Sequence, residues 1–205
     1  MAIKLAVLLS GNGTTLQNVL DRCAAGELDA SVVCILSSRE NAYGLERARA
    51  AGIPAISVPR KDFADTETFG CAVWAVVDEF APDLIVLAGF MSLLPIPEAY
   101  AGRIMNVHPA LIPAFSGRGM YGDNVHRAVL DYGVKTTGVT VHFVDDEYDR
   151  GPVIAQSTVP VMEDDTVETL AARVQEEERK LYPAAIQLYA EGRLKIEGRH
   201  VRVLP

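Results

Sequence analysis

The chain has 205 residues, of which 49% are hydrophobic and 22% charged, and its formal net charge is −8. This length and composition are ordinary for a globular domain with a sizeable core. The acidic balance argues against a nucleic-acid partner held through a basic surface, and no apolar stretch is long enough to span a bilayer.

Residues 1–108 alternate buried strands with helices. Apolar runs predict strands at 3–9, 31–38, 54–59, 83–89 and 104–108, and helical spacing predicts helices at 14–26, 41–52 and 65–81. Strands that are apolar on both faces indicate a parallel sheet covered on two sides. The predicted fold class is α/β, a Rossmann-like open sheet that is mainly parallel in this half.

The pattern changes beyond Pro109. Residues 109–124 are rich in proline and glycine and predict an ordered loop. Runs at 138–145 and 153–161 predict strands of a mixed or antiparallel extension, followed by a long helix from about 166, perturbed at Pro183, and a hairpin-like tail. We expect helices on both faces of the sheet and one domain, 1–205, made of the halves 1–108 and 109–205.

The three cysteines, Cys23, Cys34 and Cys71, show neither CxxC nor metal-ligand spacing. They lie in apolar runs, so we expect buried free thiols, as in a reducing compartment. The first apolar run is short and leads into polar and glycine residues, which fits a strand better than a signal peptide. A cytoplasmic protein is therefore expected.

The stretch SGNGTTLQ (10–17) links the first strand to the first helix. It matches neither the G-x-G-x-x-G nor the P-loop pattern. Gly11 and Gly13 allow close backbone approach to the N–H groups of a helix N-terminus, and Thr14 and Gln17 have the spacing of a capping box. The stretch is typical of a single-phosphate site or, equally, of a plain tight turn.

Asn106 and His108 share one face of the strand at 104–108, and Pro109 ends that strand. Thr140 and His142 have the same spacing, and Asp149 precedes a turn that can return it to the sheet edge. A carboxylate beside His108 would stabilise the imidazolium and raise the pKa of the ring. An imidazolium and an amide aimed at one spot suit a developing oxyanion, as in acyl transfer to an amine.

Other interpretations of these residues stay open. Asn106 and His108 could be a satisfied polar pair that closes a strand, and His108, His142 and an aspartate could be metal ligands. On the long helix, Glu178 falls on the apolar stripe with Gln175 one turn earlier, so ligand hydroxyls or a buried arginine would satisfy it. His126 and His200 are expected to be ordinary surface residues.

Several segments in order along the chain resemble the folate-dependent glycinamide ribonucleotide formyltransferases. They are VLLSGNGTTLQ, APDLIVLAGFM, NVHPALIPAF, GVTVHFVDDEYDRGPVIAQ and ARVQEEERKLYP. The resemblance implies a single formyltransferase domain that transfers the formyl group of 10-formyltetrahydrofolate, its co-substrate, to the amine of glycinamide ribonucleotide in purine biosynthesis. It also implies small-molecule partners, no metal, and a monomer or weak homodimer.

The resemblance also implies roles for individual residues. His108 is the catalytic acid, Asn106 binds the formyl oxygen, and Asp149 pairs with His108 and raises its pKa, with Thr140 and His142 in support. The ribonucleotide site comprises Gly13, Thr14, Thr15, Gln175 and Glu178. The folate site comprises Met91, Ser92, Leu93, Leu94, Asn106, Asp145, Asp146, Glu147, Tyr148 and Asp149.

The sequence departs from that family at four places. Ser92 stands where the family often has arginine, and no arginine lies near Thr66 early in the third helix. Arg150 replaces a glycine beside Asp149, and the 116–125 loop is longer than in some relatives. These departures affect the folate contacts more than the chemistry. The alternatives are a 10-formyltetrahydrofolate hydrolase, a metal-dependent hydrolase, and a nucleotide-binding module without catalysis.

Overall fold

The computed structural model describes residues 2–205, which divide into two compact units. Unit 1 ends at Met105 and unit 2 begins at Asn106. Whether the two units make up one domain stays a prediction. In residues 2–205, no helix combines the length and the apolar character that crossing a membrane requires.

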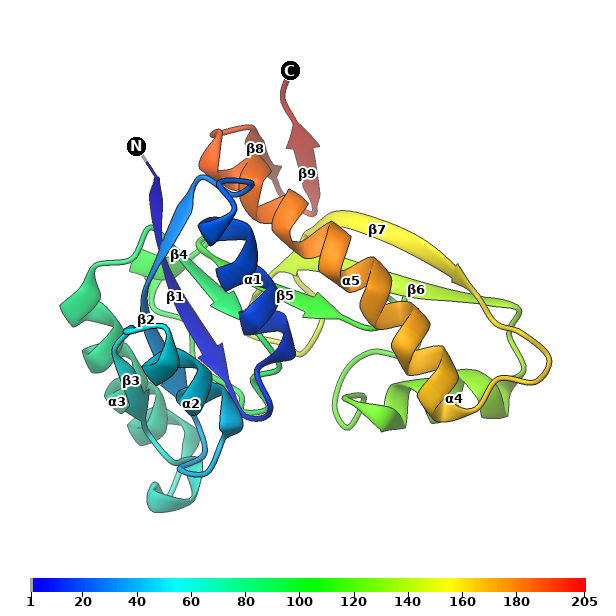
Figure 1. Ribbon diagram of the computed structural model, residues 1–205, viewed down its shortest axis with the longest axis horizontal. Coiled ribbons are helices and arrows are strands. Elements are labelled where there is room, and N and C mark those ends of the chain that lie inside the picture. The colour runs from blue at the N-terminus through cyan, green and yellow to red at the C-terminus, as the bar shows by residue number, and fades with distance from the viewer. Residues whose placement is uncertain (1) are drawn as a thin grey trace. The chain divides into compact units, whose positions relative to one another are not determined.

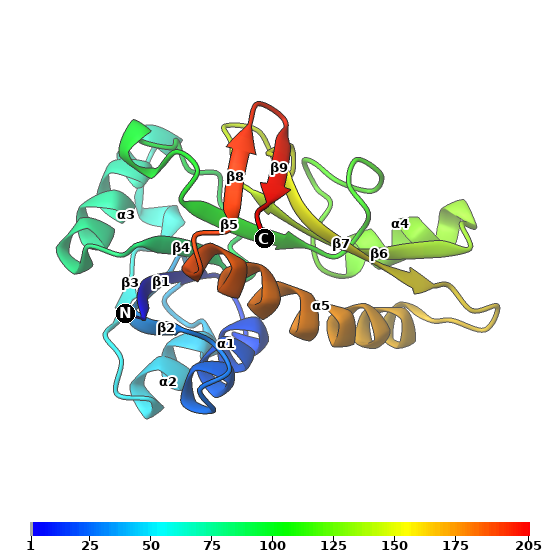
Figure 2. The ribbon, with the colours of Figure 1, turned by 90° about the horizontal axis from the view of Figure 1, so that it is seen from above.

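Unit 1 is a parallel sheet between two layers of helices. Its strands are β1 (Ile3–Leu9), β2 (Ala30–Ser37), β3 (Ala55–Ser57) and β4 (Leu84–Leu87), in the order β3-β2-β1-β4. Helices α1 (Thr14–Ala24) and α2 (Tyr43–Ala50) cover one face and α3 (Thr66–Phe80) covers the other (Figure 2). Residues 5–9 of β1 have no exposed surface, as expected for a strand covered on both faces.

Unit 2 contains a mixed sheet that supports one long helix. Its strands are β5 (Ile104–His108, whose first two residues belong to unit 1), β6 (Thr136–Phe143), β7 (Val153–Pro160), β8 (Leu194–Glu197) and β9 (His200–Val203). β6–β7 and β8–β9 are antiparallel and β7–β9 is parallel. Helix α5 (Val167–Ala190), orange in Figure 1, packs on β6 and β7 and continues past Pro183. The predicted fold class is confirmed in both halves.

Helix α4 (Asp123–Tyr132) is an element that the sequence did not predict. The glycines and prolines before it indicate a loop, and the helix begins only after Gly122. Its buried side includes Val129, which packs with Val139 of β6 and with Leu170 and Val174 of α5. Burial of these apolar side chains stabilises the helix, although the glycines and prolines that precede it do not favour helix formation.

Two expectations about burial were wrong. Of the free cysteines only Cys34 is buried, whereas Cys23 is half-buried and Cys71 is exposed on the outer side of α3. Burial raises the pKa of the Cys34 thiol to about 11. His126 is not a surface residue, because α4 turns it inward and leaves it 5% exposed. His200 is exposed, as predicted.

Candidate active site

The glycine-rich loop of unit 1 is shaped by close backbone packing. Gly13 has φ of 69° and immediately precedes α1, and a Cβ on it would lie 2.8 Å from the Cα of Gly44. The N–H of Gly44 donates to the carbonyl of Gly11 at 3.1 Å. The loop therefore rests on the start of α2, and only glycine fits at position 13. The first turn of α1 contains no acidic residue, so its N–H groups face no competing carboxylate there.

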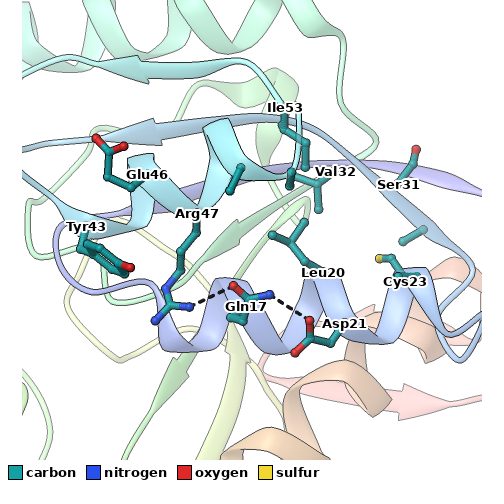
Figure 3. A pocket seen from close by; sticks show the side chains of 14 residues that line it. Gln17, Leu20, Asp21, Cys23, Ser31, Val32, Tyr43, Glu46, Arg47 and Ile53 are labelled. Carbon is teal, nitrogen blue, oxygen red and sulfur yellow. Dashed lines mark hydrogen bonds between the residues drawn. The ribbon is translucent and has the colours of Figure 1, made fainter.

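Arg47 of α2 supports this loop, a role that no sequence pattern indicates. Its Nε donates to the carbonyl of Asn12 at 2.9 Å and its guanidinium to Oε1 of Gln17 at 2.9 Å (Figure 3). Gln17 also donates to Asp21 at 2.9 Å. The predicted capping box was wrong, because Gln17 is engaged by Arg47 and Asp21 and no side chain in the described chain caps α1 at Gly13. The contact joins residues 35 positions apart, which no local motif reveals.

The segment at Met91–Leu94, predicted to contact folate, leaves the carboxyl end of β4. The N–H of Met91 donates to Oγ of Ser10 at 2.9 Å, and Ser10 shares a 2.6 Å hydrogen bond with Ser38. Met91 is 43% exposed and Leu94 is 8% exposed. Leu93 is also exposed, so the segment presents two apolar side chains to solvent while the N–H of Met91 is bonded to Ser10, the residue after β1.

At the end of β5 in unit 2, Asn106, His108 and Asp149 come together. Nδ1 of His108 lies 3.4 Å from Oδ2 of Asp149, and Nδ2 of Asn106 donates to Oδ1 of the same carboxylate at 3.4 Å. His108 is 3% exposed and the side chain of Asp149 is 11% exposed. The three residues that the sequence predicted to be catalytic therefore form one nearly buried cluster.

The turn after β6 places Asp149 in this cluster. Asp149 has φ of 53°, an unusual conformation for a residue other than glycine. A Cβ on Gly151 would lie 1.8 Å from the carbonyl oxygen of Phe143, so only glycine lets the turn lie against β6. The N–H of Gly117, from the loop at 109–122, donates to Oδ2 of Asp149 at 3.0 Å. The returning turn that the sequence suggested is present.

The pKa of His108 differs from the expectation. Burial lowers it below its ordinary value and outweighs Asp149 and the carbonyl of Phe115, which both raise it. Nε2 donates to that carbonyl at 2.8 Å. The expected increase was wrong because a strand-end histidine gives no sign in the sequence of how deeply it is buried. Both ring nitrogens face acceptors, because Nδ1 lies beside the carboxylate of Asp149 and Nε2 beside the carbonyl of Phe115.

The carboxyl group of Asp149 is ionised. Its burial favours the neutral form, but His108 and the N–H of Gly117 help to hold the pKa of the carboxyl group below its usual range. Any proton that His108 gains is therefore met by a full negative charge 3.4 Å away.

His142 orients the amide of Asn106. Nδ1 of His142 donates to the carbonyl of Phe143 at 2.8 Å, which leaves Nε2 as an acceptor. Nδ2 of Asn106 donates to that Nε2 at 3.2 Å. Because Asp149 also only accepts, the nitrogen and not the oxygen of the Asn106 amide faces both groups.

Thr140 organises the loop that follows β5. Its hydroxyl, which has no exposed surface, donates to the carbonyl of Ala110 at 2.7 Å and accepts from the N–H of Ile112 at 3.1 Å. Nε2 of Gln156 on β7 donates to the same hydroxyl at 2.9 Å and to the carbonyl of Ile112 at 3.0 Å. Thr140 thus supports the site without entering it, and Gln156 is a second support that the sequence did not suggest.

The other predicted binding residues lie on separate parts of unit 2. In the segment 145–148, Asp146, Glu147 and Tyr148 are exposed, and Glu147 pairs with Arg150 at 2.5 Å. On α5, Gln175 and Glu178 are half-buried, and Gln175 accepts from Arg179 at 3.3 Å. Roles in ligand binding for these residues stay predictions.

Two further observations concern histidines and metals. Within residues 2–205, Nδ1 of His126 is buried and has no hydrogen-bond partner. Burial lowers the pKa of His126, while Asp123 opposes that effect. In the same stretch of chain, no group of three or more histidine, cysteine or acidic side chains is placed to hold a metal ion.

Comparison with known proteins decides the family. The sequence profile described as formyl transferase matches residues 3–186. The chain belongs to the formyl transferase family. It is 40% identical over 196 residues to the phosphoribosylglycinamide formyltransferase of Escherichia coli, covering 95% of this chain and 90% of that protein. The crystal structure of glycinamide ribonucleotide transformylase 1 from Symbiobacterium toebii is 45% identical, with a TM-score of 0.93, over 99% of this chain and 94% of that one.

A family member with a different printed activity is less similar. The formyltetrahydrofolate deformylase from Pseudomonas syringae has a TM-score of 0.90 but only 25% sequence identity. The match covers 100% of this chain and 67% of the deformylase. The hydrolase alternative is therefore less supported than formyl transfer.

Proposed function

We propose that this protein transfers the formyl group of 10-formyltetrahydrofolate to the amine of glycinamide ribonucleotide in de novo purine biosynthesis. The observation that supports this most is the buried cluster of an amide, an imidazole and a carboxylate at the end of β5. It occurs in a chain that is 40% identical to a phosphoribosylglycinamide formyltransferase and 45% identical to a glycinamide ribonucleotide transformylase, in both cases over nearly its whole length.

The proposed chemistry is direct attack of the amine, with His108 carrying the proton. The amine nitrogen bonds to the formyl carbon and the carbonyl electrons move to oxygen. His108 takes the proton that the nitrogen releases, and the imidazolium is stabilised by Asp149 and by the carbonyl of Phe115. The ring returns the proton to the folate nitrogen as its bond to the formyl carbon breaks, which gives the formylated product and tetrahydrofolate.

Asn106 is proposed to stabilise the oxyanion. Of its two amide hydrogen bonds, the one to Asp149 is longer, at 3.4 Å against 3.2 Å for the one to His142. The formyl oxygen can take the place of Asp149 while His142 keeps the amide in orientation. A preorganised donor of this kind costs little reorganisation during the reaction.

The substrate contacts follow the predicted assignments. We propose that Gly13, Thr14 and Thr15 hold the phosphate through main-chain N–H groups, and that Gln175 and Glu178 bind the rest of the ribonucleotide. Folate is assigned to Met91–Leu94 and to the segment 145–149. A cytoplasmic location and a monomer or weak homodimer remain predictions.

The test is turnover of purified His108→Ala with both substrates, following release of tetrahydrofolate. We expect a fall of about 10²–10⁴-fold, the usual contribution of a proton-transfer group, with an unchanged circular dichroism spectrum. His200→Ala, an exposed histidine of the same unit, is the matched control. Near-normal turnover of His108→Ala would remove the assigned role, and release of tetrahydrofolate without ribonucleotide would favour the hydrolase.

A further inference from the structure

The tip of the C-terminal hairpin lies against the loop that carries Asp149. Strands β8 and β9, labelled in Figure 2, are antiparallel, and the turn that joins them contains Arg199. β9 begins beside the start of β7, because His200 pairs with Val153. The loop at 144–152 connects β6 to β7 and ends at this same point. The hairpin therefore places Arg199 next to the exit of a loop that lies 49 positions earlier in the sequence.

Arg199 contacts both ends of the segment 145–150. Its guanidinium donates to the main-chain carbonyl of Arg150 and lies 3.9 Å from a carboxylate oxygen of Asp145. The side chain of Arg199 is 61% exposed. The residues between the two contacts include 146–148, which are exposed. One surface side chain thus spans the ends of a segment whose middle faces solvent.

The segment 145–150 has an excess of negative charge. It contains four carboxylates and one cation, Arg150, so its formal charge is −3. Arg150 pairs with Glu147 at 2.5 Å, and Arg199 supplies a cation for Asp145. Carboxylates that lie close together in one loop repel each other. A cation that joins the two ends of the loop therefore favours its compact conformation.

The contact with Arg150 also restrains the backbone next to Asp149. The φ of Asp149 is 53°, and a residue other than glycine keeps such a conformation where its surroundings enforce it. The carbonyl that accepts from Arg199 belongs to the residue directly after Asp149. Arg199 therefore restrains this turn from outside the cluster that contains His108.

We propose that Arg199 is a positioning residue for the folate co-substrate, because it holds the segment 145–150 in the conformation that binds folate. The inference rests on the proposed function, which assigns 145–149 to folate. Asp149 keeps its own hydrogen bonds to Gly117 and Asn106, so loss of Arg199 should loosen the folate segment more than it moves the catalytic carboxylate. The C-terminal hairpin thus contributes to folate affinity from outside the site.

The first experiment measures the steady-state kinetics of Arg199→Ala in the full chain. The KM for 10-formyltetrahydrofolate should rise about threefold to tenfold, as expected for an exposed ion pair and a hydrogen bond from a charged donor. The KM for the ribonucleotide and kcat should stay within about twofold, because only folate binding is weakened. Arg199→Lys should recover part of the lost affinity, since an ammonium keeps the charge without the fork of donors. Arg202→Ala, an exposed cation of the same hairpin that pairs with Glu197, is the matched control.

The second experiment is hydrogen–deuterium exchange of the protein without substrates, which does not depend on activity. Arg199→Ala should speed the exchange of the peptide that covers 144–152, while exchange within α5 stays unchanged. Arg202→Ala should leave both regions as they are. Unaltered exchange at 144–152 in Arg199→Ala would show that Arg199 does not hold the loop, and the proposal fails.

Failure of this inference can be told apart from failure of the proposed function. Absence of formyl transfer by the unsubstituted chain would overturn the function itself. Normal transfer by Arg199→Ala with an unchanged KM for the folate would overturn only the positioning role. An equal rise in the KM of both substrates would also overturn it, because a general loss of structure does not select the folate.

Discussion

The two units present their polar groups in different ways. In unit 1 the glycine-rich loop offers main-chain N–H groups, and the nearby Arg47 holds the loop by its carbonyl. In unit 2 the groups are side chains, and each of Asn106, His108 and Asp149 is fixed by hydrogen bonds to other parts of that unit. The contrast predicts that substitutions at the glycine-rich loop of unit 1 mainly raise the KM for the ribonucleotide, whereas substitutions in the cluster of Asn106, His108 and Asp149 mainly lower kcat.

The largest expected effect comes from Asp149→Asn, which keeps the shape and removes the charge. The imidazolium of His108 then lacks its counter-ion, so kcat should fall by about 10²–10⁴-fold with little change in the KM for the ribonucleotide. Steady-state kinetics with each substrate varied in turn measures both quantities. Asp131→Asn removes an exposed carboxylate of the same unit and is the control. A rise in KM with unchanged kcat would contradict the catalytic role proposed for this cluster.

Gly151→Ala tests whether the turn fixes the acid. A Cβ at this position would overlap the carbonyl of Phe143, so the turn must shift and Asp149 with it. We expect kcat to fall about tenfold to a hundredfold, together with a lower Tm, since a misplacement of about 1 Å can cost 10²-fold. Gly11→Ala, at a glycine outside the left-handed region where a Cβ meets open space, is the comparison for the thermal effect. Unchanged kcat would show that Asp149 does not need this turn.

Arg47→Ala tests the support of the loop in unit 1. Loss of the hydrogen bonds to Asn12 and Gln17 should loosen the loop and raise the KM for the ribonucleotide about fivefold to tenfold, while kcat stays within twofold, as expected for one or two hydrogen bonds to a charged group. Arg49→Ala, two residues along the same helix and paired with Glu46, should change neither value. An effect on kcat alone would contradict the proposal that the glycine-rich loop of unit 1 binds the ribonucleotide.

The smallest expected effect is a loss of stability at low pH. All four histidines lie beyond residue 105, and burial lowers the pKa of His108 and of His126. In the unfolded chain a histidine takes up a proton near pH 6.5, whereas the folded protein keeps these two rings neutral to lower pH. The free energy of unfolding that they contribute above pH 6.5 is therefore lost as the pH falls. Each contributes at most about 1.4 kcal/mol per pH unit. Hydrogen exchange below pH 6.5 should show protection lost first in unit 2, and a uniform loss would contradict this.

Much of the fold could be predicted because burial leaves a periodic pattern. The strand at 3–9 was predicted to the residue, since a strand covered on both faces must be continuously apolar. Helix α4 was missed because its stabilisation comes from packing against α5 and not from its own first turn. The capping box at Thr14 was wrong, whereas Thr166 and Thr169 at the start of α5 form a reciprocal cap with threonine in place of the usual acid.

The candidate site was predictable in its members but not in its energetics. Asn106, His108 and Asp149 were found from strand spacing and from the turn that follows β6. The direction of the pKa shift of His108 was not, because it depends on burial by the loop that contains Phe115. Arg47 and Gln156 form hydrogen bonds to residues that lie 35 and 44 positions away in the sequence, and no local pattern reveals such contacts.

The glycine at position 151 has a consequence for how such an enzyme can vary. Next to Gly151, the carbonyl of Pro152 accepts a hydrogen bond from the N–H of Phe143 at 2.9 Å. The position of Asp149 therefore depends on the end of β6. The exposed residues 146–148 belong to the loop that connects β6 to β7. The exposed residues of this loop can therefore vary without moving the carboxylate of Asp149.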